Sequence, residues 1–352
     1  MVNTIWLGLS AVLGSTAVLG VAGSWEQPPR DVPQADISNG ALRVKLYLPD
    51  SGRGYYQGTR FDWSGVIAAL EYRGHNYYGP WFSRVDSRVH DYQYESAEIV
   101  GSTCSGIMGP VDEFQTDGSA LGFAEAQVGG TFIKIGVGVL RKDAAKYDFV
   151  HQYEILDPGK WTIKTHADSV EFTHTLTDPA NGYGYVYHKI VRLAEGKPEM
   201  VLEHHLQNTG RHTIRTNVYN HNFLVLDRQP PGPDFALTFP FQLGWPHSPS
   251  QSLVEIRGNQ FVFLKPLTGK DMVFTILSGF GDNAKDNEIR IENRRVGMGM
   301  LIRGSRPLSD LHLWSIRSVL SVEPFITMTI EPGQEFTWDL TYLYYALAPD
   351  SK

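Results

Sequence analysis

The stretch YGYVYHKIVRLAEGKPEMVLEHHLQNTGRHTIRTNVYNHNF, residues 183–223, holds three β-type runs separated by EGKP and NTGR. Its runs are rich in Val, Ile and Tyr and alternate in polarity, as half-buried strands do. Both spacers carry Gly, and one carries Pro, so they supply turn chemistry. The same pattern continues from Ala41 to the end of the chain. We therefore predict an all-β protein, a large antiparallel β-sandwich.

Long helical periodicities are few. The best helix candidates are SGVIAAL at 64–70 and the N-terminal segment. Residues 41–348 show no internal repeat and no change of composition, which predicts a single β-sandwich domain.

Composition excludes several classes of partner and site. The 352 residues carry a formal net charge of −7 without a basic stripe, so nucleic acid is not an expected ligand. Cys104 is the only cysteine, which excludes an intramolecular disulfide and a Cys-rich zinc site. No Gly-x-Ser-x-Gly elbow and no phosphate-binding glycine motif is present.

The first 23 residues contain no charged side chain and are apolar from Ile5 onward. They predict a signal peptide cleaved near Ser24 or a membrane anchor, a buried helix being the remaining alternative. Either of the first two implies export, to the periplasm or outside the cell, with membrane attachment in the case of an anchor. Residues 24–40, with several prolines, are expected to be a linker.

The segment NVYNHNFLVLD, residues 217–227, places an imidazole between two amides in a predicted strand. Alternation puts His221 on one face with Tyr219 and Phe223, and Asn220 with Asn222 on the other. The simplest interpretation is a core histidine bonded to a carbonyl. The polar residues around it instead favour a site, because such a strand should bury apolar groups.

These residues carry a family resemblance. The turn L-x-N-T-G at 206–210, followed by RHTIRTNV and YNHNF, resembles the aldose 1-epimerase (galactose mutarotase) superfamily. The segment LHLWSIRSVLSVEPFITMTIEPGQEFTWDLTYLYY, residues 311–345, is similar to its closing segment. The resemblance implies an enzyme that interconverts sugar anomers without cofactor or metal, with His221 as acid and Glu323 as base. The distance between the two side chains is the most informative observation, because a shared pocket with a sugar-sized gap between them would favour the epimerase.

Further residues are candidates for binding sugar, and each of them also has a structural alternative. Arg60 lies in a Gly-x-Arg context similar to a sugar-binding arginine of the family, and Asp62 is either an acceptor for sugar or the partner of Arg60 in a salt bridge. Asn220 and Asn222 are further candidate sugar ligands. Trp81, Trp314 and Trp245 are candidate platforms or core residues, and at most one is expected to bind sugar.

One feature departs from the family. CSGIMGPVDEF, residues 104–114, lacks the second active-site histidine of galactose mutarotases, and His75 is a candidate substitute or a solvated loop residue.

These residues are compatible with more than one function. The substrate is expected to be a monosaccharide or a glycan. The alternatives are a non-catalytic carbohydrate-binding protein and an accessory domain related to polysaccharide lyases, since one sandwich fold hosts several functions. A zinc site is disfavoured because His204 and His205 are adjacent and would face opposite sides of a strand.

Overall fold

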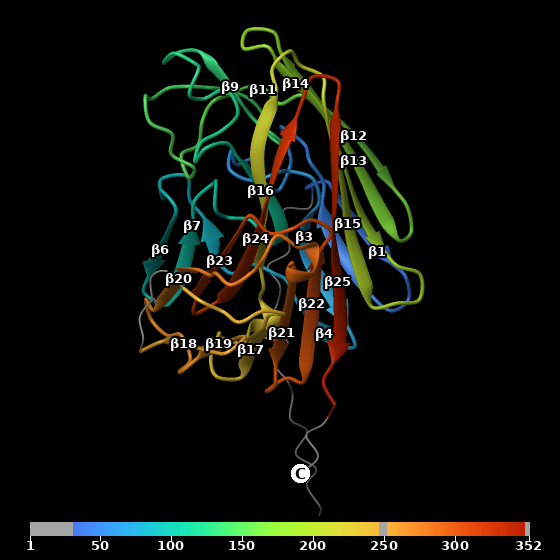
Figure 1. Cartoon of the computed structure of the whole chain (residues 1–352), viewed down its shortest axis with the longest axis vertical. Helices are drawn as coiled ribbons and strands as arrows, with labels where there is room; N and C mark the ends of the chain where they lie inside the picture. Colours follow the sequence, from blue (N-terminus) through green and yellow to red (C-terminus); the bar gives the residue numbers. More distant parts are fainter. Residues whose placement is uncertain (1–30, 246–251, 349–352) are drawn as a thin grey trace, which may run out of the picture. The chain divides into compact units, whose positions relative to one another are not determined.

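The structure, a computed structural model, describes residues 31–245 and 252–348 (Figure 1). Within these ranges the chain forms strands and two short 3-10 turns, η1 (Leu226–Arg228) and η2 (Ala284–Asp286), with no α-helix. None of the described helical turns is long and apolar enough to cross a membrane. The predicted signal peptide or anchor at 1–23 lies outside the described residues.

Two antiparallel sheets form the body of the protein. The larger sheet consists, in spatial order, of β12 (Lys160–Thr165), β13 (Ser169–Asp178), β14 (Tyr183–Leu193), β15 (Glu199–Asn208), β25 (Glu335–Ala346), β22 (Met298–Gly304), β21 (Glu288–Asn293), β17 (Phe235–Thr238), β19 (Gln260–Phe263) and β18 (Val254–Arg257). The smaller consists of β20 (Met272–Ile276), β23 (Asp310–Ile316), β24 (Val319–Ile330), β16 (Ile214–Phe223) and β8 (Gly109–Gln115).

Apolar side chains from the two sheets pack against each other. Phe114 of β8 lies 5.4 Å from the Tyr187 ring of β14 and 6.1 Å from the Trp338 ring of β25, measured between ring centroids. Burial alternates along the strands of the larger sheet. In β13 every second side chain from Val170 to Asp178 is buried, and those between them are half-buried or exposed. The predicted all-β antiparallel sandwich is confirmed.

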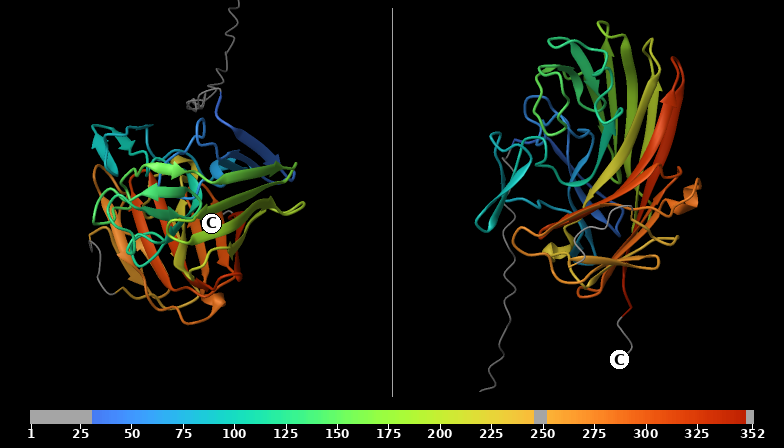
Figure 2. Two further views of the ribbon diagram at one scale, coloured as in Figure 1. Left: turned by 90° about the horizontal axis from the view of Figure 1, so that it is seen from above. Right: turned by 60° about the vertical axis from the view of Figure 1, so that its left-hand side comes forward.

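Three small sheets complete the fold. One contains β1 (Gln34–Ser38), β2 (Arg43–Tyr47), β3 (Val66–Tyr72) and β4 (His75–Asn76); another contains β11 (Ile155–Asp157), β10 (Gly138–Arg141) and β9 (Thr131–Lys134); the last contains β5 (Arg84–Val85), β7 (Glu98–Gly101) and β6 (Tyr92–Glu95). Figure 2 shows the teal strands β5 to β7 on the opposite side from the long green strands of the larger sheet. Phe61 and Trp81, from segments that precede β8, pack with Phe223 on the outer face of the smaller sheet.

Two local predictions were wrong. Strand β1 lies inside the stretch expected to be a linker and pairs with β2, so the fold begins before residue 41. The helix candidate at 64–70 is largely strand β3, which pairs with β2. Val66, Ile67 and Ala68 are all buried, so both faces are apolar at the start of this strand and alternation is not visible there in the sequence.

Charged side chains are buried between the two sheets. Lys189 of β14 is almost fully buried, and its Nζ lies 2.7 Å from an Asp112 carboxylate oxygen and 3.4 Å from one of Asp62. His204 of β15 contacts the same Asp112 oxygen at 3.1 Å. A lysine between two carboxylates satisfies charges that would be costly to bury alone.

Replacing Lys189 by Met should destabilise the protein by about 3–5 kcal/mol, because it leaves Asp62 and Asp112 buried without their cation. The matched control is Lys164→Met. Lys164 pairs with Glu171 at 3.5 Å, but these side chains are 67% and 39% exposed. The control should change stability by less than about 1 kcal/mol. Urea unfolding measures both, and equal losses would show that the buried cluster is not a special source of stability.

Candidate active site

The side chains of strand β16 alternate between the two faces of the smaller sheet. Tyr219, His221 and Phe223 face the segments that cover the smaller sheet, as the alternation predicts. Asn220 and Asn222 face the interior of the sandwich, where the Tyr342 hydroxyl lies 2.8 Å and 3.0 Å from their side-chain oxygens. The structure therefore does not place Asn220 or Asn222 where they could bind a sugar beside His221; their amides satisfy buried polar groups.

His221 and Glu323 are brought together by the pairing of β16 with β24. The register pairs Tyr219 with Phe325 and so carries His221 opposite Glu323. The distance from His221 Nε2 to Glu323 Oε1 is 3.2 Å, and the two side chains are only 5% and 7% exposed. The expected sugar-sized gap between them is absent, because the two groups are in direct contact.

This pair lies in a pocket of about 160 Å³. A cavity of about 150 Å³ admits a benzene ring, so the pocket suits one ring-sized molecule. The residues that line it are Arg60, Trp81, Asp91, Tyr92, Ser105, Phe149, His221, Phe223, Phe274, Trp314 and Glu323.

Aromatic rings surround the imidazole. The ring of Phe223 stacks on His221 at 3.7 Å, and Phe61 meets it edge-on at 5.6 Å. Trp314 lies 5.8 Å from His221, and Trp81 stacks on Phe223 at 5.7 Å. Two of the three candidate tryptophans thus line the pocket. Trp245 lies elsewhere and packs against Phe261.

Arg60 lines the pocket, and its guanidinium is paired with the carboxylate of Glu113. Its Nε donates to Glu113 Oε2 at 2.8 Å, and its Nη2 donates to the Tyr219 hydroxyl at 3.1 Å. Lys134 donates to the other Glu113 oxygen at 3.0 Å. Burial alone would raise the pKa of Glu113, but Lys134 and Arg60 lower it to about 2. Glu113 is therefore ionised and holds Arg60 in place.

Asp62 is not the partner of Arg60. Its carboxylate contacts Lys189 at 3.4 Å and accepts hydrogen bonds from Ser64, on the sandwich side of the chain. Burial raises the pKa of Asp62, with Lys189 opposing the shift. The predicted ion pair of Asp62 with Arg60 is therefore wrong, and Asp62 is not among the residues that line the pocket.

Burial sets the protonation of the catalytic candidates. It lowers the pKa of His221 well below its usual value, and the nearby Arg60 lowers it further. Burial raises the pKa of Glu323 to about 8, although Arg60 opposes that shift. At neutral pH the pair therefore holds one proton, on the carboxyl group, beside a neutral imidazole. The Ser321 hydroxyl lies 2.7 Å from His221 Nδ1, which keeps Nε2 turned toward Glu323.

His75 does not supply a second histidine. Its Nδ1 lies 2.6 Å from an Asp227 oxygen at the junction of β4 and η1, and it is not among the residues that line the pocket. Across residues 31–245 and 252–348, no cluster of three His, Cys, Asp or Glu side chains could hold a metal ion.

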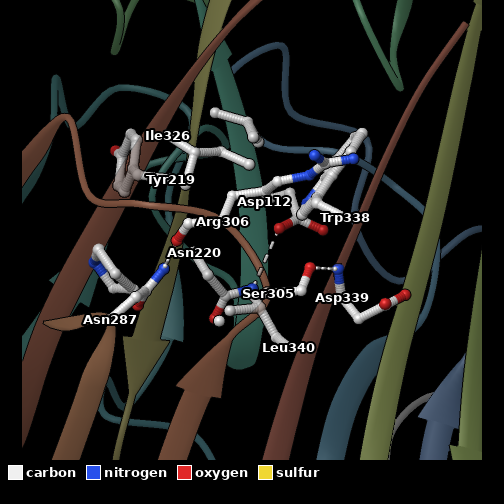
Figure 3. A pocket seen from close by; sticks show the side chains of 13 residues that line it. Asp112, Tyr219, Asn220, Asn287, Ser305, Arg306, Ile326, Trp338, Asp339 and Leu340 are labelled. Carbon is white, nitrogen blue, oxygen red and sulfur yellow. Dashed lines mark hydrogen bonds between the residues drawn. The ribbon is translucent and has the colours of Figure 1, made fainter. Parts of the chain in front are cut away.

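A second cavity of about 10 Å³ lies on the sandwich side of β16 (Figure 3). Figure 3 shows Asp112 and Asn220 beside it, joined by a hydrogen bond of 3.1 Å. Its volume is near that needed for a single water molecule. It is therefore too small for a sugar.

Several residues that line the pocket, or that hold its lining residues as Glu113 holds Arg60, were missed by the sequence reasoning. Glu113 follows another acid in PVDEF, and two adjacent acids inside an apolar strand were the available signal. Asp91 accepts from Ser105 in the pocket wall, and Phe149 places its ring 4.6 Å from the Arg60 guanidinium. These last residues come from loops, and nothing in the local sequence indicates where they lie.

No family model matches the sequence, and no curated protein matches it. Solved structures do match. A candidate aldose 1-epimerase from Escherichia coli K12 is 13% identical at a TM-score of 0.52, covering 90% of this chain and 100% of that chain. A galactose mutarotase-like protein from Lactobacillus casei is 12% identical at 0.52, covering 89% and 100%. Another from Clostridium acetobutylicum is 10% identical at 0.52, covering 89% and 95%.

The chain has the galactose mutarotase-like fold. The resemblance predicted from YNHNF and SVEPF is confirmed at the level of this fold. Because identities of 10–13% show the fold alone, the chemistry of the pocket has to be argued from the residues of this chain.

Glu323→Gln should change how stability depends on pH. Below about pH 4.5 the carboxyl is protonated in both folded and unfolded chains, but up to about pH 8 only the folded chain keeps the proton. The free energy of unfolding of the native protein therefore falls as pH rises through this window. Glutamine has no proton to hold, so the melting temperature of the variant minus that of the native protein should grow from about pH 5 to pH 8.

The control is Glu98→Gln at an exposed carboxylate of β7. Its difference in melting temperature should stay flat with pH. A flat difference for Glu323→Gln as well would mean that Glu323 is ionised in the folded protein.

Proposed function

We propose that this protein interconverts the α and β anomers of an aldose by acid–base ring opening. The observation that carries the proposal is the contact between His221 Nε2 and Glu323 Oε1 at 3.2 Å inside a ring-sized aromatic pocket. The galactose mutarotase-like fold supports a carbohydrate substrate. The reaction needs one acid and one base and no cofactor.

The two reacting oxygens of a cyclic sugar are bonded to the same carbon. A base removes the proton of the anomeric hydroxyl while an acid protonates the ring oxygen; the bond from the anomeric carbon to the ring oxygen breaks, and a carbonyl forms. Rotation and closure on the other face then return both protons. Because the two oxygens are so close, an acid and a base in contact can serve both.

The pKa directions assign the roles. Glu323, with a pKa of about 8, carries the proton at neutral pH and would protonate the ring oxygen. His221 is neutral, so its Nε2 would accept the proton of the hydroxyl. This allocation is the reverse of the one that the family resemblance implies. The roles exchange during ring closure, so the pair ends as it began.

The alternatives are less well supported by the pocket. A binding protein needs the aromatic rings but gains nothing from a buried acid–base pair, which is costly to bury. A uronate lyase needs a cation that neutralises the substrate carboxylate, but the Arg60 guanidinium is already paired with Glu113 at 2.8 Å.

Replacing Glu323 by Gln or His221 by Asn should each slow anomer exchange by about 10²-fold or more, because each removes one proton-transfer group. The double variant should be hardly slower than either single variant, since the two groups act as a unit. Polarimetry or NMR exchange measurements on hexoses, pentoses and uronic acids give the rates. Sugar affinity should change little.

The control for these variants is His75→Asn, which alters a histidine outside the pocket and should leave the rate unchanged. A native protein that binds a sugar without raising anomer exchange above the spontaneous rate would favour the carbohydrate-binding protein instead.

The pH profile should reflect the protonated carboxyl and the neutral imidazole. The enzymatic kcat/KM, corrected for spontaneous exchange, should fall as pH rises through about 8, where Glu323 loses its proton. On the acid side it should persist below pH 6.5, because the pKa of His221 is lowered. Residual activity of Glu323→Gln should lack the alkaline decline. A profile that rises through pH 8 would assign the carboxylate as the base.

A further inference from the structure

The sheet face that carries the catalytic pair continues beyond the pocket. The register pairs Glu323 of β24 with His312 of β23, and His312 with Ile276 of β20. The neighbouring row runs from Ser321 through Trp314 to Phe274. Residues paired across adjacent strands share a face. One continuous floor therefore leads from Glu323 to the edge strand β20.

The outer end of this floor is apolar and open. Met272, Phe274 and Ile276 are 50%, 51% and 40% exposed, while Val273 and Thr275 between them are buried. Phe274 also lines the catalytic pocket. Three large apolar side chains in a row on an edge strand are a hazard that proteins usually avoid, so such a row marks a binding surface.

Polar groups lie beside these apolar side chains. His312 Nε2 lies 3.0 Å from an Asp310 oxygen, and the two side chains are 20% and 43% exposed. The His312 ring meets the Phe274 ring edge-on at 5.8 Å. An exposed aromatic face next to hydrogen-bonding groups suits a sugar ring, which has apolar C–H faces and hydroxyls at its rim.

We propose that this outer floor, made of Met272, Phe274, Ile276, His312 and Asp310, is a subsite for a second sugar ring. The inference rests on the proposed function. It makes the substrate the reducing end of a short oligosaccharide, with the reacting ring beside His221 and Glu323 and the next ring over Phe274.

Three arguments select this occupant. Ring opening requires a free anomeric hydroxyl, so any larger substrate must extend from another hydroxyl of the reacting ring, as a reducing-end sugar does. β20 lies two strands from β24, or about 10 Å, which leaves room for a ring next to the reacting one. A second copy of the chain seated on Phe274 would cover the pocket mouth, because this ring also lines the pocket.

The test compares matched sugars: glucose with cellobiose and maltose, galactose with β-1,4-galactobiose, and xylose with xylobiose. For the accepted pair, the native protein should show a kcat/KM for anomer exchange about tenfold higher for the disaccharide, and Phe274→Ala should lower that ratio by about five- to tenfold. Ile276→Ser should lower the same ratio. Val128→Ala, at a side chain 58% exposed outside the pocket, is the control and should leave the ratio unchanged.

The outcomes separate this inference from the proposed function. Equal kcat/KM values for each pair, unaffected by Phe274→Ala, would overturn the subsite while anomer exchange stands. If the protein exchanges the anomers of no sugar, the proposed function is overturned. Calorimetry with the same pairs of sugars then tests the subsite. A disaccharide that binds no better than its monosaccharide overturns the subsite. Sedimentation that shows a native dimer and a Phe274→Asp monomer would assign the surface to self-association and overturn it too.

Discussion

The buried carboxylates of β8 are the constraint on which the rest of the structure depends. Asp112 and Glu113 are adjacent, so one faces the interior of the sandwich and the other faces the pocket side. Asp112 binds Lys189 of the larger sheet at 2.7 Å, and Glu113 binds Lys134 and Arg60 at 3.0 Å and 2.8 Å. Neither acid can be buried without these cations, so one strand fixes both the packing of the sheets and the wall of the pocket.

The same arrangement explains the chemistry of the pair. Glu113 neutralises Arg60, and the aromatic rings exclude water, so burial outweighs the nearby positive charge at Glu323. The carboxyl therefore stays protonated and the imidazole neutral, which is the state that an acid–base pair needs before the substrate arrives. With Arg60 unpaired, its charge would favour an ionised Glu323 and remove the acid.

The sequence was informative where structure is local. Alternation and turn residues predicted the strands and the opposite faces of His221 and Asn220, and the family resemblance singled out Glu323. It was uninformative where pairing is distant: Arg60 finds its carboxylate 53 residues away in Glu113 rather than in nearby Asp62. It also failed at the start of β3, where consecutive buried residues cover both faces and alternation disappears.

The direct contact of His221 with Glu323 replaces the sugar-sized gap, and the proposed hemiacetal chemistry has to be compatible with it. An acid and a base on opposite sides of a ring suit reactions in which attack and departure occur on opposite faces. Ring opening instead moves protons at two oxygens that share one carbon, so an acid and a base that lie side by side can serve both. The antiparallel register of β16 and β24 supplies this placement from the backbone, and Ser321 then fixes the imidazole at 2.7 Å. Rigid strands thus hold both groups without a mobile loop.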